Sequence, residues 1–197
     1  MKTIKLLPPK LEGGKPFMQV VKERKSSREF SSKELPLQII SELLWAANGI
    51  NRPESSHCTA PSAMNTQGID IYLSKADGLY LFDPQRFAII LIVNQDIRAM
   101  TGVQPFVKDA PLNLIFTADH AKMQKTGSDI DFYSAADVGF TSENVYLYCA
   151  FAGLATVVRG SIDRPALAKA MKLRSEQKII LAQSVGYLKY TQGAVKQ

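Results

Sequence analysis

Apolar residues recur every three or four positions in two long stretches of the chain, a period that predicts amphipathic helices. The first stretch follows Pro36, which can begin a helix, and ends at Gly49, which can close it. Its apolar residues share one face: Leu37, Ile40, Leu43, Leu44 and Ala47. The second stretch runs from about Asp131 to Gly153 and repeats small residues at the same spacing, which permits close packing against a neighbour.

Two shorter helices are predicted, together with one segment that lacks any period. A helix over residues 16–24 is expected because Pro16 can occupy a first helical position. Another is expected after Asp163, whose carboxylate can cap a helix that Pro165 begins. Residues 1–15 combine prolines, glycines and lysines, a composition that resists regular structure. We therefore expect an arm lying on the body there, not a domain.

Runs rich in β-branched and aromatic residues predict strands between these helices. The predicted strands are Ile69–Leu73, Leu79–Phe82, Phe87–Val93, Leu112–Ala118, Leu154–Gly160 and Lys178–Val185. Asp83, Pro84 and Gln85 indicate a hairpin turn between the second and third of them. Residues 51–67 show no period and predict a long loop of the kind that carries function. Interleaved strands and helices without an internal repeat predict a single α+β domain over residues 16–197, built as a three-layer α/β/α sandwich.

Composition excludes several classes of protein. The 197 residues, 46% of them hydrophobic, suffice for one sizeable core. The net charge of +6 comes from scattered Lys and Arg residues without a recognition motif, so we expect no nucleic-acid partner. No run of 18 apolar residues occurs and residues 1–17 lack a signal-peptide core, so we expect no membrane span and a cytoplasmic location. Two cysteines and two histidines indicate neither a disulfide framework nor a metal site.

A basic segment where the first helix ends is a candidate phosphate site. Arg24, Lys25, Ser26 and Arg28 lie within RKSSREF, which combines three cations with two hydroxyls. Arginine presents paired N–H donors to phosphate oxygens, lysine adds a compact charge, and a serine hydroxyl can complete the shell. Such a run is also typical of a solvated surface, so alone it leaves both readings open.

Two further segments can approach a flat ligand. The loop PSAMNTQ places hydroxyl and amide groups beside small residues, and Pro61, Ser62 and Asn65 are its candidate contacts, although the same residues also suit a plain turn. The third segment is the strand end at Val158, Arg159 and Gly160, where a glycine lets backbone N–H groups face a ligand.

These three segments, in this order, resemble the motifs of the nitroreductase superfamily. The sequences that carry the resemblance are RKSSREF, PSAMNTQ and GLATVVRG, with a terminal strand ending in VGY. The resemblance covers roughly residues 16–190. Within the superfamily, LLWAANGINR, APSAMN and GLYLFDP look most like the SagB-type branch, whose members oxidise azoline rings in peptides.

The resemblance implies a homodimer with FMN at its interface. The basic segment would hold the FMN phosphate, ribityl chain and pyrimidine edge, and the loop from Pro61 to Asn65 would reach the flavin of the other protomer. The strand end at Val158 to Gly160 would line the isoalloxazine near N5, and Lys189 would be a further contact. Relatives often carry an acid where this chain has Arg159, so we expect its side chain to act on the flavin.

The function implied is transfer of electron pairs from NADH or NADPH to nitroaromatics, quinones or similar small oxidants. The flavin would carry the chemistry, and no side chain is assigned a catalytic role. Two alternatives stay open: a SagB-like dehydrogenase that oxidises a specific peptide or heterocycle, and a protein that binds flavin without turnover. For Tyr146 and its neighbours on the long helix we expect a packing role.

Overall fold

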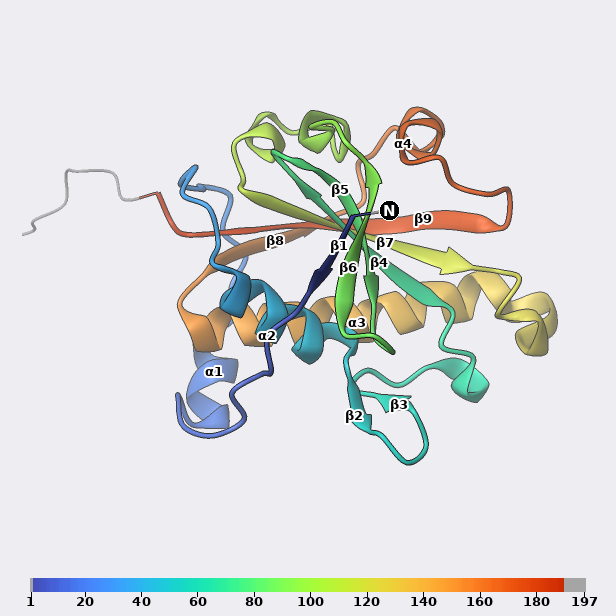
Figure 1. Cartoon of the computed structure of the whole chain (residues 1–197), viewed down its shortest axis with the longest axis horizontal. Coiled ribbons are helices and arrows are strands. Elements are labelled where there is room, and N and C mark those ends of the chain that lie inside the picture. Colours follow the sequence, from blue (N-terminus) through green and yellow to red (C-terminus); the bar gives the residue numbers. More distant parts are fainter. Residues whose placement is uncertain (1, 190–197) are drawn as a thin grey trace, which may run out of the picture.

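The computed structural model describes residues 2–189, which form an antiparallel seven-stranded sheet between layers of helices (Figure 1). The strand order is β1-β6-β5-β4-β7-β9-β8. The bounds of these strands are β1 Thr3–Lys5, β4 Ile69–Lys75, β5 Gly78–Asp83, β6 Ala88–Val93, β7 Leu112–Asp119, β8 Ala155–Arg159 and β9 Gln177–Gly186. All six strands predicted from the sequence are present, and the turn between β5 and β6 is the predicted hairpin.

The helices lie on both faces of the sheet, which confirms the predicted mixed α+β architecture. Helices α1 (Phe17–Glu23), α2 (Leu37–Asn48) and α3 (Ile130–Ala152) lie on one face, where α2 and α3 cover the larger core. Helix α4 (Arg164–Met171) packs a smaller core on the other face. The predicted cap is present, because the Asp163 carboxylate accepts the Ala166 N–H at 3.1 Å.

The last strand within residues 2–189 does not lie at an edge of the sheet. β9 pairs with β7 along most of its length, and on its other side Ala182–Gly186 pair with β8. Every residue of β7 is buried, as the apolar run in the sequence predicted. This order leaves β8 as an edge strand, whose outer backbone groups need other partners.

Two segments are more regular than their composition indicated. The prediction of no regular structure in residues 1–15 was wrong for Thr3–Lys5, which pair with the edge of β6, while Leu6 beside them is 3% exposed. The open edge of β6 and an apolar contact for Leu6 override the local composition. In the predicted loop 51–67, a short hairpin joins β2 (Ile50–Arg52) to β3 (His57–Cys58), and a 3₁₀ turn spans Ala63–Asn65.

Residues 2–189 contain neither a helix that could span a membrane nor a cluster of metal-binding side chains. None of their helices combines the length and apolarity that a bilayer crossing requires. Nor does that part of the chain bring three or more His, Cys, Asp or Glu side chains together in a way that could hold a metal ion.

Candidate functional site

The basic segment runs along the open edge of β8. The Ser27 N–H donates to the carbonyl of Thr156 on that edge at 2.8 Å. Further on, Phe30 bridges to Leu188, beyond the end of β9. The first and third sequence motifs, far apart in the chain, therefore lie side by side.

Tyr146 on α3 connects these two motifs through its hydroxyl group. The hydroxyl lies 2.8 Å from the Ser26 Oγ and accepts the Val158 N–H at 3.0 Å. The ring is 6% exposed, and the Arg24 guanidinium lies 5.2 Å from its centre. The sequence prediction of a packing role thus missed a polar one. The available signal was a phenol on a buried helix face, where the hydroxyl needs a partner.

A cavity of about 430 Å³ beside Tyr146 has a cationic wall, and the residues around it fit a phosphate-bearing ligand. Its charged lining residues are Lys15, Lys22, Glu23, Arg24 and Lys25. Glu23 is paired with Lys15 at 2.7 Å, and this hydrogen bond holds the pKa of Glu23 below its usual value. Among the described residues, Arg24 and Lys25 form no salt bridge, so their charges remain available to an anion.

A smaller cavity of about 260 Å³ on the other side of the segment brings Arg28 and Lys189 together. Asp109 and the aromatic rings of Phe30 and Phe106 complete much of its wall. The two cations were predicted to contact one ligand from opposite ends of the chain. Their shared cavity makes that arrangement feasible.

The side chain of Arg159 points into the protein, not along the open edge of β8. It is 5% exposed, and its guanidinium donates to the Thr101 carbonyl, to Asn113 Oδ1 at 2.8 Å and to Ser184 Oγ at 3.1 Å. None of these acceptors is a carboxylate, and burial lowers the pKa of Arg159 to about 10. The cation therefore stays charged at neutral pH inside a neutral network that joins β7, β9 and the turn at Thr101.

The edge of β8 presents its backbone groups at alternate residues. The Thr156 carbonyl and the Val158 N–H both face outward, where they meet Ser27 and Tyr146. Gly160 follows in the same alternation. A side chain added to Gly160 would meet only Leu181, at 3.6 Å, so space remains around this glycine.

The loop from Pro61 to Asn65 is held in an unusual backbone conformation. Met64, Asn65 and Gln67 all have positive φ angles near 50°, which side-chain-bearing residues rarely adopt. The Ala63 N–H donates to both carboxylate oxygens of Asp137, at 3.1 and 3.2 Å. Asp137 is 2% exposed, and burial raises its pKa. The hydrogen bonds to the buried Asp137 carboxylate hold the loop in this conformation. Backbone conformations of this rare kind are often found at functional sites.

Within one protomer this loop does not meet the other two motifs. It is attached to α3 at Asp137, whereas the basic segment contacts α3 at Tyr146. The two points are nine positions apart along the helix, roughly 14 Å at about 1.5 Å per residue. Figure 1 shows the 3₁₀ turn of the loop toward one end of α3 and the chain after α1 at the other end. Pro61, Ser62 and Asn65 are therefore apart from the remaining candidate residues.

Comparison with known proteins decides the family. The model of the nitroreductase family matches residues 21–187, most of the chain. The chain belongs to the nitroreductase family. A nitroreductase by name from Methanocaldococcus jannaschii is 31% identical over 166 residues, which are 79% of this chain and 83% of that protein. Membership of the nitroreductase family makes the chain an oxidoreductase and supports a flavin cofactor.

Solved structures agree with this family. A crystal structure of a protein from Ralstonia eutropha JMP134, named as a nitroreductase, has a TM-score of 0.93 and 43% identity, over 97% of this chain and 91% of that one. A nitroreductase from Desulfovibrio desulfuricans, solved in complex with FMN, has a TM-score of 0.66 and 19% identity, over 94% and 93% of the two chains. At that identity the second likeness concerns the nitroreductase fold alone. The SagB-type branch stays a prediction.

Proposed function

We propose that this nitroreductase-family chain binds FMN in a homodimer and transfers electron pairs from NADH or NADPH to small oxidants such as nitroaromatics and quinones. The observation that carries the proposal is that Arg24 and Lys25, which form no salt bridge within residues 2–189, line a cavity that Tyr146 joins to the edge of β8. A dianionic phosphate suits such a wall because charge-assisted hydrogen bonds are roughly twice as strong as neutral ones.

The chain's own residues would bind and orient the cofactor. Arg24, Lys25 and Ser26 would hold the phosphate, while Arg28 and Lys189 would meet the pyrimidine edge from their shared cavity. The Val158 N–H already donates to Tyr146, so we assign the backbone contact near N5 to Gly160. Bound flavin supplies the two-electron chemistry, and the protein supplies position and electrostatics.

A homodimer accounts for the separation of the second motif, the loop from Pro61 to Asn65, from the other two. The strained loop would bring Ser62 and Asn65 to the second protomer's cofactor, since both residues lie away from the site of their own protomer. Apolar side chains exposed on α1, α3 and the loop offer surface for such an interface: Phe17, Met18, Met64, Phe132 and Phe140. A light-scattering mass near the 21.7 kDa of a single chain would contradict this part of the proposal.

The cofactor assignment is tested by the absorption spectrum and by charge removal. Purified protein is expected to be yellow and to release FMN, not FAD, on denaturation. Arg24→Ala and Arg28→Ala should each weaken FMN binding tenfold or more, because a charge-assisted hydrogen bond contributes about 1.5–3 kcal/mol. Arg86→Ala is the matched control, since this arginine is 73% exposed on the β5–β6 turn. Unchanged FMN affinity in both site variants would place the cofactor elsewhere.

The reaction is tested by steady-state turnover. We expect oxidation of NADH or NADPH that depends on added menadione or nitrofurazone. FMN-loaded protein that oxidises neither nucleotide with either acceptor would overturn the proposed reaction. That result would leave two alternatives, a SagB-like dehydrogenase and a protein that binds flavin without turnover. An assay for oxidation of a heterocycle-containing peptide distinguishes them, because only the dehydrogenase would oxidise it.

A further inference from the structure

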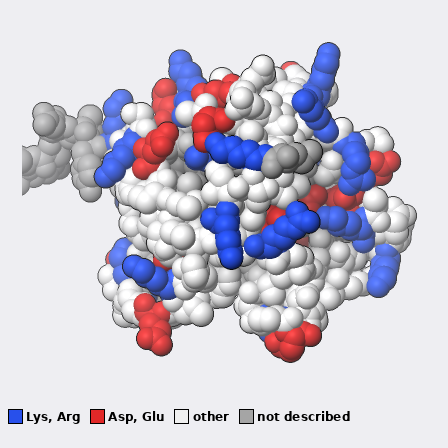
Figure 2. Space-filling view, viewed as in Figure 1, with Lys and Arg blue, Asp and Glu red and all other residues white. Residues whose placement is uncertain are grey.

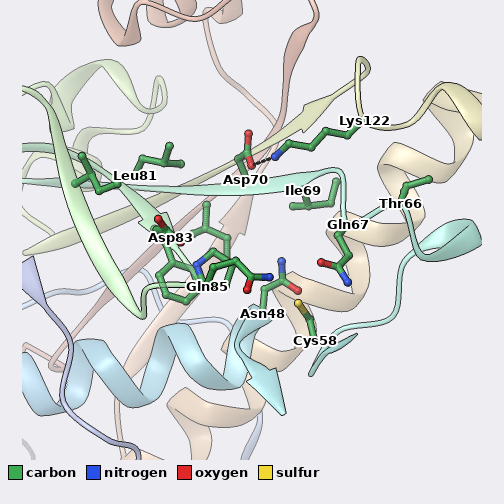
Figure 3. A pocket seen from close by; sticks show the side chains of 14 residues that line it. Asn48, Cys58, Thr66, Gln67, Ile69, Asp70, Leu81, Asp83, Gln85 and Lys122 are labelled. Atoms are coloured by element: carbon green, nitrogen blue, oxygen red, sulfur yellow. Dashed lines mark hydrogen bonds and ion pairs between the residues drawn. The ribbon is translucent and has the colours of Figure 1, made fainter. Parts of the chain in front are cut away.

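A second cavity of about 430 Å³ lies apart from the candidate cofactor site (Figure 3). It is bounded by the end of α2, by β3, by the chain leading into β4 and by the β5–β6 turn. None of its lining residues belongs to the cavities that contain Arg24 or Arg28. We propose that this cavity binds a small, electrically neutral ligand that carries amide or lactam groups and a hydrocarbon part.

The charged residues of this cavity already have partners. The Asp70 carboxylate is paired with Lys122 at 2.7 Å and also accepts Gln177 Nε2 at 3.3 Å. Asp83 accepts the Arg86 N–H at 3.0 Å. Paired charges of both signs give little preference for an ionic ligand, in contrast to the cationic wall beside Tyr146. An ion entering here would also lose hydration without gaining a free counter-charge.

The polar groups that this cavity offers to a ligand are neutral. Figure 3 shows the carboxamides of Asn48, Gln67 and Gln85, each from a different element, directed toward one common space. Within residues 2–189, no hydrogen bond joins the side chain of Asn48 or Gln85 to another residue. Gln67 Nε2 donates to the Ser56 carbonyl at 2.9 Å and to Asn65 Oδ1 at 3.2 Å, which leaves the Gln67 carbonyl oxygen as its acceptor for a ligand. The Thr66 hydroxyl is buried and likewise lacks a partner in that part of the chain. These groups can form new hydrogen bonds with a ligand.

The chemistry of these groups defines the ligand class. A primary carboxamide offers an N–H donor and a carbonyl acceptor side by side, which complements the same pair in an amide or lactam. Apolar side chains form much of the remaining wall: Ile69, Ile71, Leu81, Phe82 and Ile90. Such a wall favours a ligand with a hydrocarbon part over a fully hydroxylated one. The volume lies within the usual range for small-molecule sites, about 300–1,000 Å³.

The test uses N-acetylleucine amide as the probe and N-acetylleucine as its anionic counterpart of similar size. The probe is titrated into ¹⁵N-labelled protein, and the side-chain NH₂ signals of Asn48, Gln67 and Gln85 are followed by NMR. We expect saturable shifts of these signals, and binding of the anion at least threefold weaker. Absence of saturable shifts, or equal binding of the anion, would overturn the proposal.

Two variants locate the binding. Gln85→Leu changes an exposed residue on a turn and should keep the fold, yet weaken binding of the probe at least threefold. Asn48→Leu should weaken binding of the probe by the same factor. Gln95→Leu is the matched control, an exposed glutamine on the turn after β6, and should bind like the parent. Equal affinity in all three variants would refute the site. The flavin spectrum of the same samples separates this result from failure of the proposed function, since the cavity shares no lining residue with the cofactor site.

Discussion

Replacing Tyr146 by phenylalanine removes one oxygen atom from the junction of two motifs. That oxygen accepts the Val158 N–H and is bonded to the Ser26 hydroxyl. The ring itself can keep its place, because phenylalanine has the same shape. The variant therefore measures the polar role of Tyr146 separately from its packing.

The size of the effect follows from what is left behind. The Val158 N–H loses its partner beside a ring that is 6% exposed, and an unsatisfied buried donor costs about 1–3 kcal/mol. We therefore expect a loss of about 2 kcal/mol, which lowers the melting temperature by roughly 4–8 °C for a chain of this size. The basic segment also loses its Ser26 hydrogen bond to α3, so FMN affinity should fall with stability.

Urea unfolding at fixed protomer concentration measures the stability, and fluorescence titration of the apoprotein measures FMN affinity. Tyr148→Phe on the same helix is the control. Its hydroxyl donates to Glu42 at 2.9 Å, and water can replace it at this half-exposed carboxylate, so FMN affinity should stay at the parent level. A loss below about 0.5 kcal/mol in Tyr146→Phe, within the range of neutral surface substitutions, would refute the reasoning.

Three further predictions concern stability. Arg159→Met should cost about 2–4 kcal/mol in urea unfolding, because the Thr101 carbonyl and the Asn113 amide oxygen lose a buried charged donor; an unchanged midpoint would contradict the network. Burial raises the pKa of Asp137, so its contribution to stability is complete below its ordinary pKa of 3.8 and is lost as the pH rises through the raised folded-state value. Asp137→Asn should remove that part of the pH dependence. A profile of stability against pH identical to that of the parent would contradict this role of Asp137. Gly78→Ala should cost about 1–3 kcal/mol in thermal unfolding, since φ is +143° and the new Cβ would lie 2.6 Å from a backbone oxygen.

Local sequence patterns predicted most elements because each pattern matched its tertiary environment. The apolar face of α2 and the buried run of β7 are examples in which periodicity and burial agree. Thr3–Lys5 escaped prediction because the strand depends on the exposed edge of β6, a partner more than 80 residues away in the chain. The short hairpin at residues 50–58 escaped for a similar reason, since its polar residues carry no alternation.

At the candidate site, sequence indicated which segments matter but not how they are joined. Motif resemblance selected Arg24, Lys25 and Ser26, and the structure places all three close to β8. The resemblance could not reveal Tyr146, because a single tyrosine on a helix carries no motif. Nor could it reveal that the side chain of Arg159 points inward, since strand alternation assigns a face only after the strand's neighbours are known.

The position of β9 between β7 and β8 has a consequence during protein synthesis. β7 and β8 are made first, yet each has a sheet neighbour that is made only when residues 177–186 follow. Until then a nascent chain exposes an unpaired edge of β7, a strand whose residues are all buried in the folded protein. An unpaired edge of this kind recruits other strands. Chains interrupted before residue 177 should therefore aggregate instead of forming a smaller folded unit. The sheet can reach its native strand order only after β9 has been made and has paired with both β7 and β8.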